Sequence, residues 1–147
     1  MKVKISHRVT VLTKFKSFYQ DMIKSSSLQL PDIYADEIVF KDPIHEIHGL
    51  ANVMSYIEST VENVEQCRFE YLDELVGEGV AYIKWNMHYL HPSISKDVQT
   101  LRGITHLHFG DKITFHEDIY DLGAMVYEHV PILGFATSVI KRRIANY

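Results

Sequence analysis

The second half of the chain consists of long segments in which apolar and polar residues alternate, and this feature limits the fold more than any other. Between Val80 and Leu90 the apolar set is Ala81, Ile83, Trp85, Met87 and Tyr89, and the set between them is Tyr82, Lys84, Asn86 and His88. A period of two places the two sets on opposite faces of a β-strand. Residues 67–75, 98–109 and 112–120 form similar segments, separated by turn residues such as Gly77 and Gly110. We therefore expect a run of long antiparallel strands.

The first half has helical periodicity instead. Apolar residues from Val11 to Ile23 recur at helical spacing, and the serines at 25–27 end that helix. Pro31 predicts a short second helix over 31–36, followed by an extended segment at 38–43. Gly49 precedes a third helix with an apolar stripe from Leu50 to Val61. Helices followed by strands predict an α+β fold in which a curled antiparallel sheet wraps around N-terminal helices.

The C-terminal segment, residues 122–147, differs from this core, which covers about 8–121 of a single domain spanning 1–147. Residues 124–130 suit one or two helical turns, and after Pro131 a last helix with a cationic end is expected over 132–144. This tail is apolar for a surface segment. The tail could cover a cavity, contact a partner subunit or bind a membrane surface. Packing against protein is favoured because the apolar stretch is short.

Composition narrows the functional class. A length of 147 residues suits one domain, and 46% hydrophobic residues suffice for a core. The single cysteine, Cys67, excludes an intrachain disulfide and fits a reducing compartment. The basic N-terminal segment 1–18 lacks the apolar run of a signal peptide, so we expect a cytoplasmic protein without a membrane span. Neither a nucleic-acid-binding pattern nor a phosphate loop is present, and no cofactor is expected.

The order of these elements and several short motifs resemble a known family. The segment Tyr34-Ala35-Asp36-Glu37-Ile38-Val39-Phe40-Lys41-Asp42-Pro43, followed by Gly49 before a helix, is similar to the nuclear transport factor 2 superfamily. The segment Ile113-Thr114-Phe115-His116-Glu117-Asp118-Ile119-Tyr120-Asp121 resembles the final strand of SnoaL-like proteins. The resemblance covers about residues 8–121 and implies a cone-shaped α+β fold, shared with ketosteroid isomerases, around a small apolar pocket.

The resemblance also implies roles for two carboxylates. In ketosteroid isomerases the aspartate of the Asp-Pro pair is the catalytic base, and that position is Asp42 here. In SnoaL-like cyclases an aspartate of the last strand acts as acid and base, and Asp118 corresponds to it. The two oxyanion-hole positions of the isomerase fall on Phe18 and Thr105, so that hole is not reproduced. The neighbouring Tyr19 is expected to point elsewhere, and steroid isomerisation is not expected.

The residues themselves favour the same region. A carboxylate in an apolar cone loses hydration and becomes a stronger base, which supports Asp42 as the catalytic base. The alternative is that Asp42 only forms the turn before Pro43. His116, Asp118 and Tyr120 share one face of a strand and can address one ligand, or form a satisfied buried polar cluster. The other residues expected to contact a ligand are Tyr34, Tyr56, Trp85, Met87, Tyr89, Thr105 and Phe18, with plain core packing as the alternative.

The nine histidines raise the question of a metal site. His88, His106 and His108 are expected on one outer strand face, and His45 and His48 lie in a loop. No fourth ligand is evident for either group, so surface or interface histidines are favoured over zinc. The outer face of the sheet suggests a homodimer.

Three functions remain open from the sequence. The first is an enzyme that isomerises, cyclises, dehydrates or hydrolyses a small apolar molecule by acid/base chemistry, with Asp42 as the base and His116 and Asp118 as its partners. The second is a non-catalytic protein that binds such a ligand. The third is an interaction module whose surface does the work.

Overall fold

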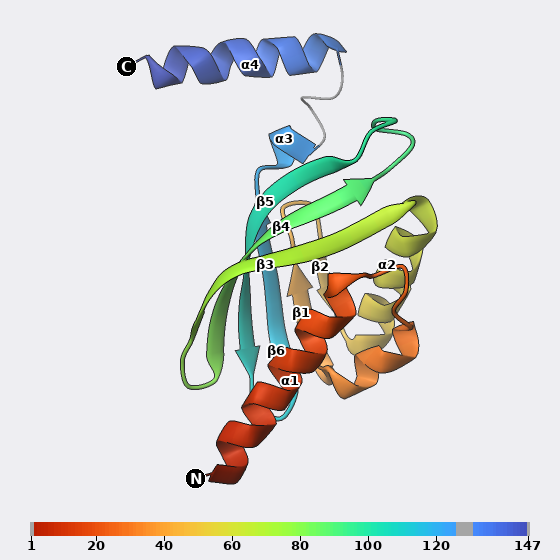
Figure 1. Cartoon of the computed structure of the whole chain (residues 1–147), viewed down its shortest axis with the longest axis vertical. Helices are drawn as coiled ribbons and strands as arrows, with labels where there is room; N and C mark the ends of the chain where they lie inside the picture. The colour runs from red at the N-terminus through yellow and green to blue at the C-terminus, as the bar shows by residue number, and fades with distance from the viewer. Residues whose placement is uncertain (1, 126–130, 147) are drawn as a thin grey trace.

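The computed structural model describes residues 2–125 and 131–146. In chain order the elements are α1 (Lys2–Gln20), η1 (Ser27–Asp32), β1 (Tyr34–Lys41), β2 (Glu46–His48), α2 (Leu50–Asn63), β3 (Gln66–Val76), β4 (Val80–Leu90), β5 (Gln99–Phe109), β6 (Ile113–Tyr120), α3 (Leu122–Met125) and α4 (Pro131–Ala145). Helices precede a run of four long strands, which confirms the α+β class expected from the sequence (Figure 1).

A single six-stranded sheet has the order β2-β1-β6-β5-β4-β3. Strands β3 to β6 follow one another as an antiparallel meander, as their turns predicted. Strand β1, however, runs parallel to β6 and antiparallel to β2, so the sheet is mixed rather than wholly antiparallel. No hairpin links β1 to β6, so tertiary packing rather than a turn sets their relative direction. The sheet curls strongly without closing (Figure 1).

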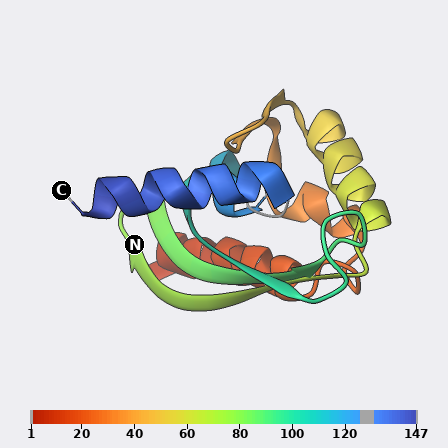
Figure 2. The same cartoon turned by 90° about the horizontal axis from the view of Figure 1, so that it is seen from above.

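Helices α1 and α2 and the turn η1 lie against the concave side of the sheet (Figures 1 and 2). The core is formed by inward side chains from both layers, including Phe15 of α1, Val53 of α2 and Ile83 of β4. The predicted inward set of β4 is confirmed for Ala81, Ile83, Trp85 and Tyr89, which are buried.

Several element boundaries differ from the sequence predictions. The short second helix is a 3-10 helix over Ser27–Asp32 rather than a helix over 31–36, because Ser26 caps it and Gln29 completes the capping box. Strand β1 therefore begins at Tyr34. Residues 46–48, expected in a loop, form β2 by pairing with the end of β1.

The tail contains the predicted last helix, α4, and one turn, α3, at 122–125. The expected helical turns over 124–130 lie mostly outside the described residues. An ion pair of 2.9 Å joins Lys141 of α4 to Asp121. Figure 1 shows α4 standing apart from the curled sheet. None of the described helices has the length and apolar character needed to cross a membrane.

Candidate functional site

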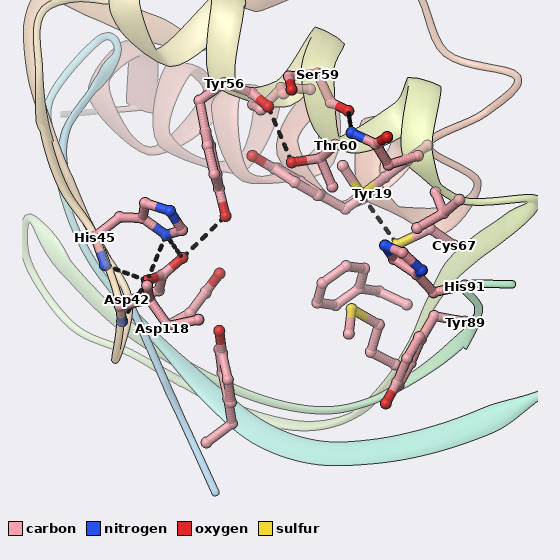
Figure 3. Close-up of a pocket in the computed structure, with 18 of the residues that line it drawn as sticks. Tyr19, Asp42, His45, Tyr56, Ser59, Thr60, Cys67, Tyr89, His91 and Asp118 are labelled. Carbon is pink, nitrogen blue, oxygen red and sulfur yellow. Dashed lines mark hydrogen bonds and ion pairs between the residues drawn. The ribbon is translucent and has the colours of Figure 1, made fainter. Parts of the chain in front are cut away.

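A cavity of about 450 Å³ lies between α2 and the inner face of the sheet (Figure 3). Its lining is Tyr19, Met22, Phe40, Asp42, Ile44, His45, Tyr56, Ile57, Ser59, Thr60, Asn63, Val64, Cys67, Phe69, Trp85, Met87, Tyr89, His91, Ile94, Asp118 and Tyr120. Most of this wall is apolar or aromatic, and its acidic and imidazole side chains are Asp42, Asp118, His45 and His91. Both the volume and this mixture are typical of sites for small organic ligands.

Asp118 is held on the cavity wall by two hydrogen bonds to one of its oxygens. Oδ1 accepts from the Thr105 hydroxyl at 2.6 Å and lies 2.8 Å from Nε2 of His116. The indole N–H of Trp85 donates to Thr105 Oγ1 at 2.7 Å, so the hydroxyl proton of Thr105 is directed to Asp118. In the part of the chain that the structure describes, Oδ2 has no hydrogen-bond partner. One carboxylate oxygen is therefore fixed and the other is open.

The hydrogen-bonded chain continues behind His116. Its Nδ1 lies 2.7 Å from the Tyr34 hydroxyl, which in turn lies 2.6 Å from the Tyr19 hydroxyl. His116 and Tyr34 are almost completely buried, and the rings of Phe15 and Phe40 pack on the imidazole. Burial raises the pKa of Tyr34 and of Tyr19 well above the ordinary value, so both keep their protons. The chain fixes the imidazole in one orientation.

Asp42 is also on the wall, but its oxygens are occupied. Oδ1 accepts from the backbone N–H groups of Ile44 at 2.8 Å and His45 at 2.6 Å. The Tyr56 hydroxyl donates to Oδ2 at 3.0 Å, and His45 Nδ1 lies 3.1 Å from both oxygens. Asp42 thus organises the loop before β2 as an Asx-type turn and binds a histidine.

The charges of these carboxylates act on two tyrosines of the wall. Burial raises the pKa of Tyr120, and the charges of Asp42 and Asp118 raise it further. Burial likewise raises the pKa of Tyr56, followed by the charge of Asp42 and its hydrogen bond. Tyr120 therefore remains a hydroxyl donor at neutral pH, between two negative groups. This end of the cavity is polar and negatively charged.

The opposite end is lined by His91, Cys67 and Tyr89 (Figure 3). Nδ1 of His91 is buried and has no partner among the described residues. Burial is the main cause that raises the pKa of the Cys67 thiol to about 12, and this thiol contacts Met22 at 3.4 Å. This end therefore contains one unsatisfied imidazole nitrogen beside a protonated thiol.

The residues expected at the site fall into two layers. On the wall are Asp42, Asp118, Tyr56, Trp85, Met87, Tyr89 and Tyr120. Behind it are His116, Tyr34, Thr105 and Phe18, which are buried and do not line the cavity. His116 and Thr105 contact Asp118 from behind, whereas Phe18 packs in the core.

Sequence reasoning missed most of the wall, and Tyr19 and His45 are the missed residues that bear on its chemistry. Tyr19 faces the cavity and Phe18 does not, which corrects the expectation that Tyr19 points elsewhere. Adjacent positions on a helix point about 100° apart. A shift of one residue in matching this sequence to the isomerase therefore exchanges the roles of Phe18 and Tyr19. The sequence places His45 in a loop cluster with His48, whereas in the structure its imidazole contacts Asp42. The only signal of this contact in the sequence is the separation of three residues between Asp42 and His45.

The outer histidines contact aromatic and polar side chains. His106 stacks on Tyr82 with ring centroids 4.5 Å apart and meets His108 at 4.7 Å. His88 instead contacts Thr100 and Glu70. Across residues 2–125 and 131–146 no group of three histidine, cysteine or acidic side chains is placed to hold a metal.

Residues 16–116 match the model of the SnoaL-like domain family. The chain belongs to this family. No curated protein matches the sequence. The match extends from the last residues of α1 to the middle of β6 and leaves Asp118 and the tail outside it.

Solved structures agree with this fold at low sequence identity. A protein of unknown function from Burkholderia pseudomallei K96243, described as NTF2-like, superposes with a TM-score of 0.71 at 11% identity, over 81% of this chain and 94% of that one. A hypothetical protein with a ketosteroid isomerase-like fold from Catenulispora acidiphila, in complex with trimethylamine, gives 0.69 at 14%, over 78% and 87%. A candidate SnoaL-like polyketide cyclase from Shewanella putrefaciens CN-32 gives 0.67 at 15%, over 79% and 90%. These likenesses establish the nuclear transport factor 2-like cone fold of this SnoaL-like domain.

Proposed function

We propose that this SnoaL-like domain binds a small, mostly apolar, uncharged molecule in its cavity and acts on the molecule by proton transfer without a cofactor. The observation that carries the proposal is the open Oδ2 of Asp118 at the polar end of an otherwise apolar wall. The other oxygen accepts two hydrogen bonds, so the carboxylate is preorganised to accept a donor of the ligand. His116 and Thr105 would act as positioning residues for that carboxylate.

The charges of the wall disfavour anionic ligands. Asp42 and Asp118 both act on the Tyr120 hydroxyl, so they share one end of the cavity. An anionic ligand placed there would meet two carboxylates at low effective dielectric. An apolar body with a hydroxyl or amino donor fits the wall better, with the donor at Asp118 and the body against Trp85 and Met87.

The single tryptophan makes binding measurable, because Trp85 lies on the cavity wall. We expect 1-aminoanthracene, a neutral aromatic amine, to quench Trp85 emission and to gain emission of its own at micromolar concentrations. Asp118→Asn should weaken binding about tenfold, which is the effect of losing one charge-assisted hydrogen bond of about 1.4 kcal/mol. Asp111→Asn, at an exposed turn, is the matched control and should leave binding unchanged.

An anionic probe tests the charge argument separately. 8-Anilinonaphthalene-1-sulfonate has a similar aromatic body and a fixed negative charge, so it should bind at least tenfold more weakly than 1-aminoanthracene. Equal affinity for the two probes would contradict the proposed polar end. If neither probe changes the Trp85 emission, the ligand-binding proposal fails.

We also infer that the domain forms a homodimer through the outer face of β4, β5 and β6. Tyr82, Ile104 and Ile119 are 45%, 41% and 53% exposed on these neighbouring strands, around the stacked ring of His106. A second copy would cover this face. Sedimentation of Ile104→Glu should then give a monomer, whereas Leu28→Glu, a substitution at an exposed site on η1, should sediment as the unaltered protein does. A monomeric unaltered protein would contradict the dimer.

A further inference from the structure

His45 lies at the polar end of the cavity with one imidazole nitrogen held by a carboxylate. Its Nδ1 is 3.1 Å from both oxygens of Asp42. A carboxylate accepts hydrogen bonds only, so Nδ1 carries the proton and Nε2 presents a lone pair. Within the described ranges Nε2 has no hydrogen-bond partner. This is the arrangement of a histidine base whose tautomer is set by an aspartate.

The pair is rigid on the side away from the ligand. The Asp42 side chain is only 4% exposed and accepts two backbone N–H groups of its own turn together with the Tyr56 hydroxyl. The Tyr56 ring also packs on the imidazole, with centroids 4.9 Å apart. Helix α2 thus supports both members, and the loop before β2 holds them on the cavity wall (Figure 3).

The same contacts argue against Asp42 as the group that touches a ligand. Its two oxygens already accept from Ile44, His45 and Tyr56. A ligand proton would have to displace one of these donors, whereas His45 is 41% exposed and offers a free nitrogen. Direct contact with the ligand therefore belongs to His45.

We propose that His45 Nε2 is the general base of this domain and that Asp42 is its positioning residue. The inference rests on the proposed function, because it requires a ligand in the cavity. Nε2 forms a bond to a proton of the ligand, the electron pair of the broken C–H or O–H bond stays on the ligand, and Asp42 stabilises the resulting imidazolium. The hydroxyl of Tyr120 and Oδ2 of Asp118 face the same end and contact the ligand without taking that proton.

A reaction that needs only a base tests this assignment. 5-Nitrobenzisoxazole is a small neutral aromatic molecule. Loss of its C3 proton forms a nitrile, breaks the ring N–O bond and releases a coloured cyanonitrophenolate. We expect the protein to accelerate this elimination. His45→Gln should lower kcat about 100-fold with KM changed less than about twofold, the loss typical of removing a positioned base. Asp42→Asn should lower kcat about tenfold, also at unchanged KM.

The matched control is His48→Gln. It removes an exposed imidazole that is close to His45 in the sequence but is not on the cavity wall, and kcat should not change. If kcat survives in His45→Gln, or falls as far in His48→Gln, the assignment of His45 as the base is overturned.

Binding measured by Trp85 quenching separates the two proposals. If the probe binds and the unaltered protein is no faster than free imidazole at the same concentration, His45 is not a base and the ligand-binding function stands. If the probe neither binds nor reacts, and 1-aminoanthracene also leaves the emission unchanged, the cavity function fails and the base assignment fails with it.

Discussion

Gly103 determines where the indole of Trp85 lies, and through it the environment of Asp118. The two residues are opposite each other on β5 and β4, and a Cβ built on Gly103 would lie 2.3 Å from the indole ring. Only the missing side chain lets the ring lie flat across the neighbouring strand. In that position its N–H reaches Thr105, whose hydroxyl donates to Asp118. Gly103, which has no side chain, therefore helps to hold the Asp118 carboxylate in place.

Gly103→Ala should destabilise the domain by about 1–3 kcal/mol, the usual cost of forcing an extra methyl group into a packed interior. The displaced indole should also lose its hydrogen bond to Thr105, so the Trp85 emission maximum should shift. Unfolding in guanidinium chloride, followed by this emission, measures both effects. Gly110→Ala is the control, because a Cβ there meets no atom within 4 Å. Equal midpoints for the two variants would show that Trp85 adjusts without strain.

Cys67 is expected to be chemically inert in the folded protein. Its pKa rises to about 12, first through burial and then through the charges of Asp21 and Asp118, so at pH 8 almost no thiolate exists. The pKa of the thiol in the folded protein exceeds its unfolded value of about 8.5. The stability that comes from keeping this thiol protonated is therefore fully present below pH 8.5 and is lost as the pH rises toward 12.

Iodoacetamide measures this thiol directly, since the chain has a single cysteine. At pH 8 alkylation of the folded protein should be at least about 100-fold slower than in guanidinium chloride, because the thiolate is the reacting species. Mass spectrometry gives both rates in one experiment. Similar rates under the two conditions would contradict the buried position of the thiol.

Among the elements, α2 depends on the glycine that precedes it. Gly49 has a φ of 89° at the N-cap, and its N–H donates to the Ile38 carbonyl at 2.8 Å. This turn brings α2 over β1, where Tyr56 reaches Asp42. The left-handed backbone is unfavourable for any residue with a Cβ, so Gly49→Ala should cost about 1–2 kcal/mol. Chemical unfolding measures the loss, and the same Gly110→Ala variant is the reference. A loss below about 0.5 kcal/mol would show that the turn relaxes.

The strands were predictable because a period of two marks both faces of each strand in the sequence itself. The boundaries of β4 and the inward position of Trp85 follow from that alternation. The parallel pairing of β1 with β6 was not predictable, because it joins segments separated by five other elements and no turn fixes it. Local patterns define elements, and contacts between distant segments define their order.

The site was predictable to the same extent. Strand parity places His116, Asp118 and Tyr120 on one face, but the structure shows that only Asp118 and Tyr120 reach the cavity. The rings of Phe15 and Phe40 pack on His116, and no sequence pattern predicts this packing. The contact of His45 with Asp42 depends on the exact turn before β2 in the same way.

At the scale of the whole molecule, the α4 side chains that the structure describes lie outside the buried interior of the domain. Val139, Ile140 and Ile144 are 36%, 59% and 69% exposed, so their apolar surface remains in water within this chain. Among the side chains that the structure describes, the main buried apolar cluster extends from Val11 to Ile113. The hydrophobic effect scales with the apolar area that is buried, so the stability of the domain should reside in that interior.

A chain that ends at Ala124 should therefore melt within about 3 °C of the full chain and keep the same 1-aminoanthracene affinity. Differential scanning calorimetry and the Trp85 titration test the two statements. Lys141→Ala in the full chain is the control for the ion pair with Asp121, and an exposed pair contributes at most about 1 kcal/mol. A fall in melting temperature of 10 °C in the shortened chain alone would show that α4 packs on the domain or on a second copy. Sedimentation of the shortened chain would then separate these two cases, because loss of a second copy also halves the mass.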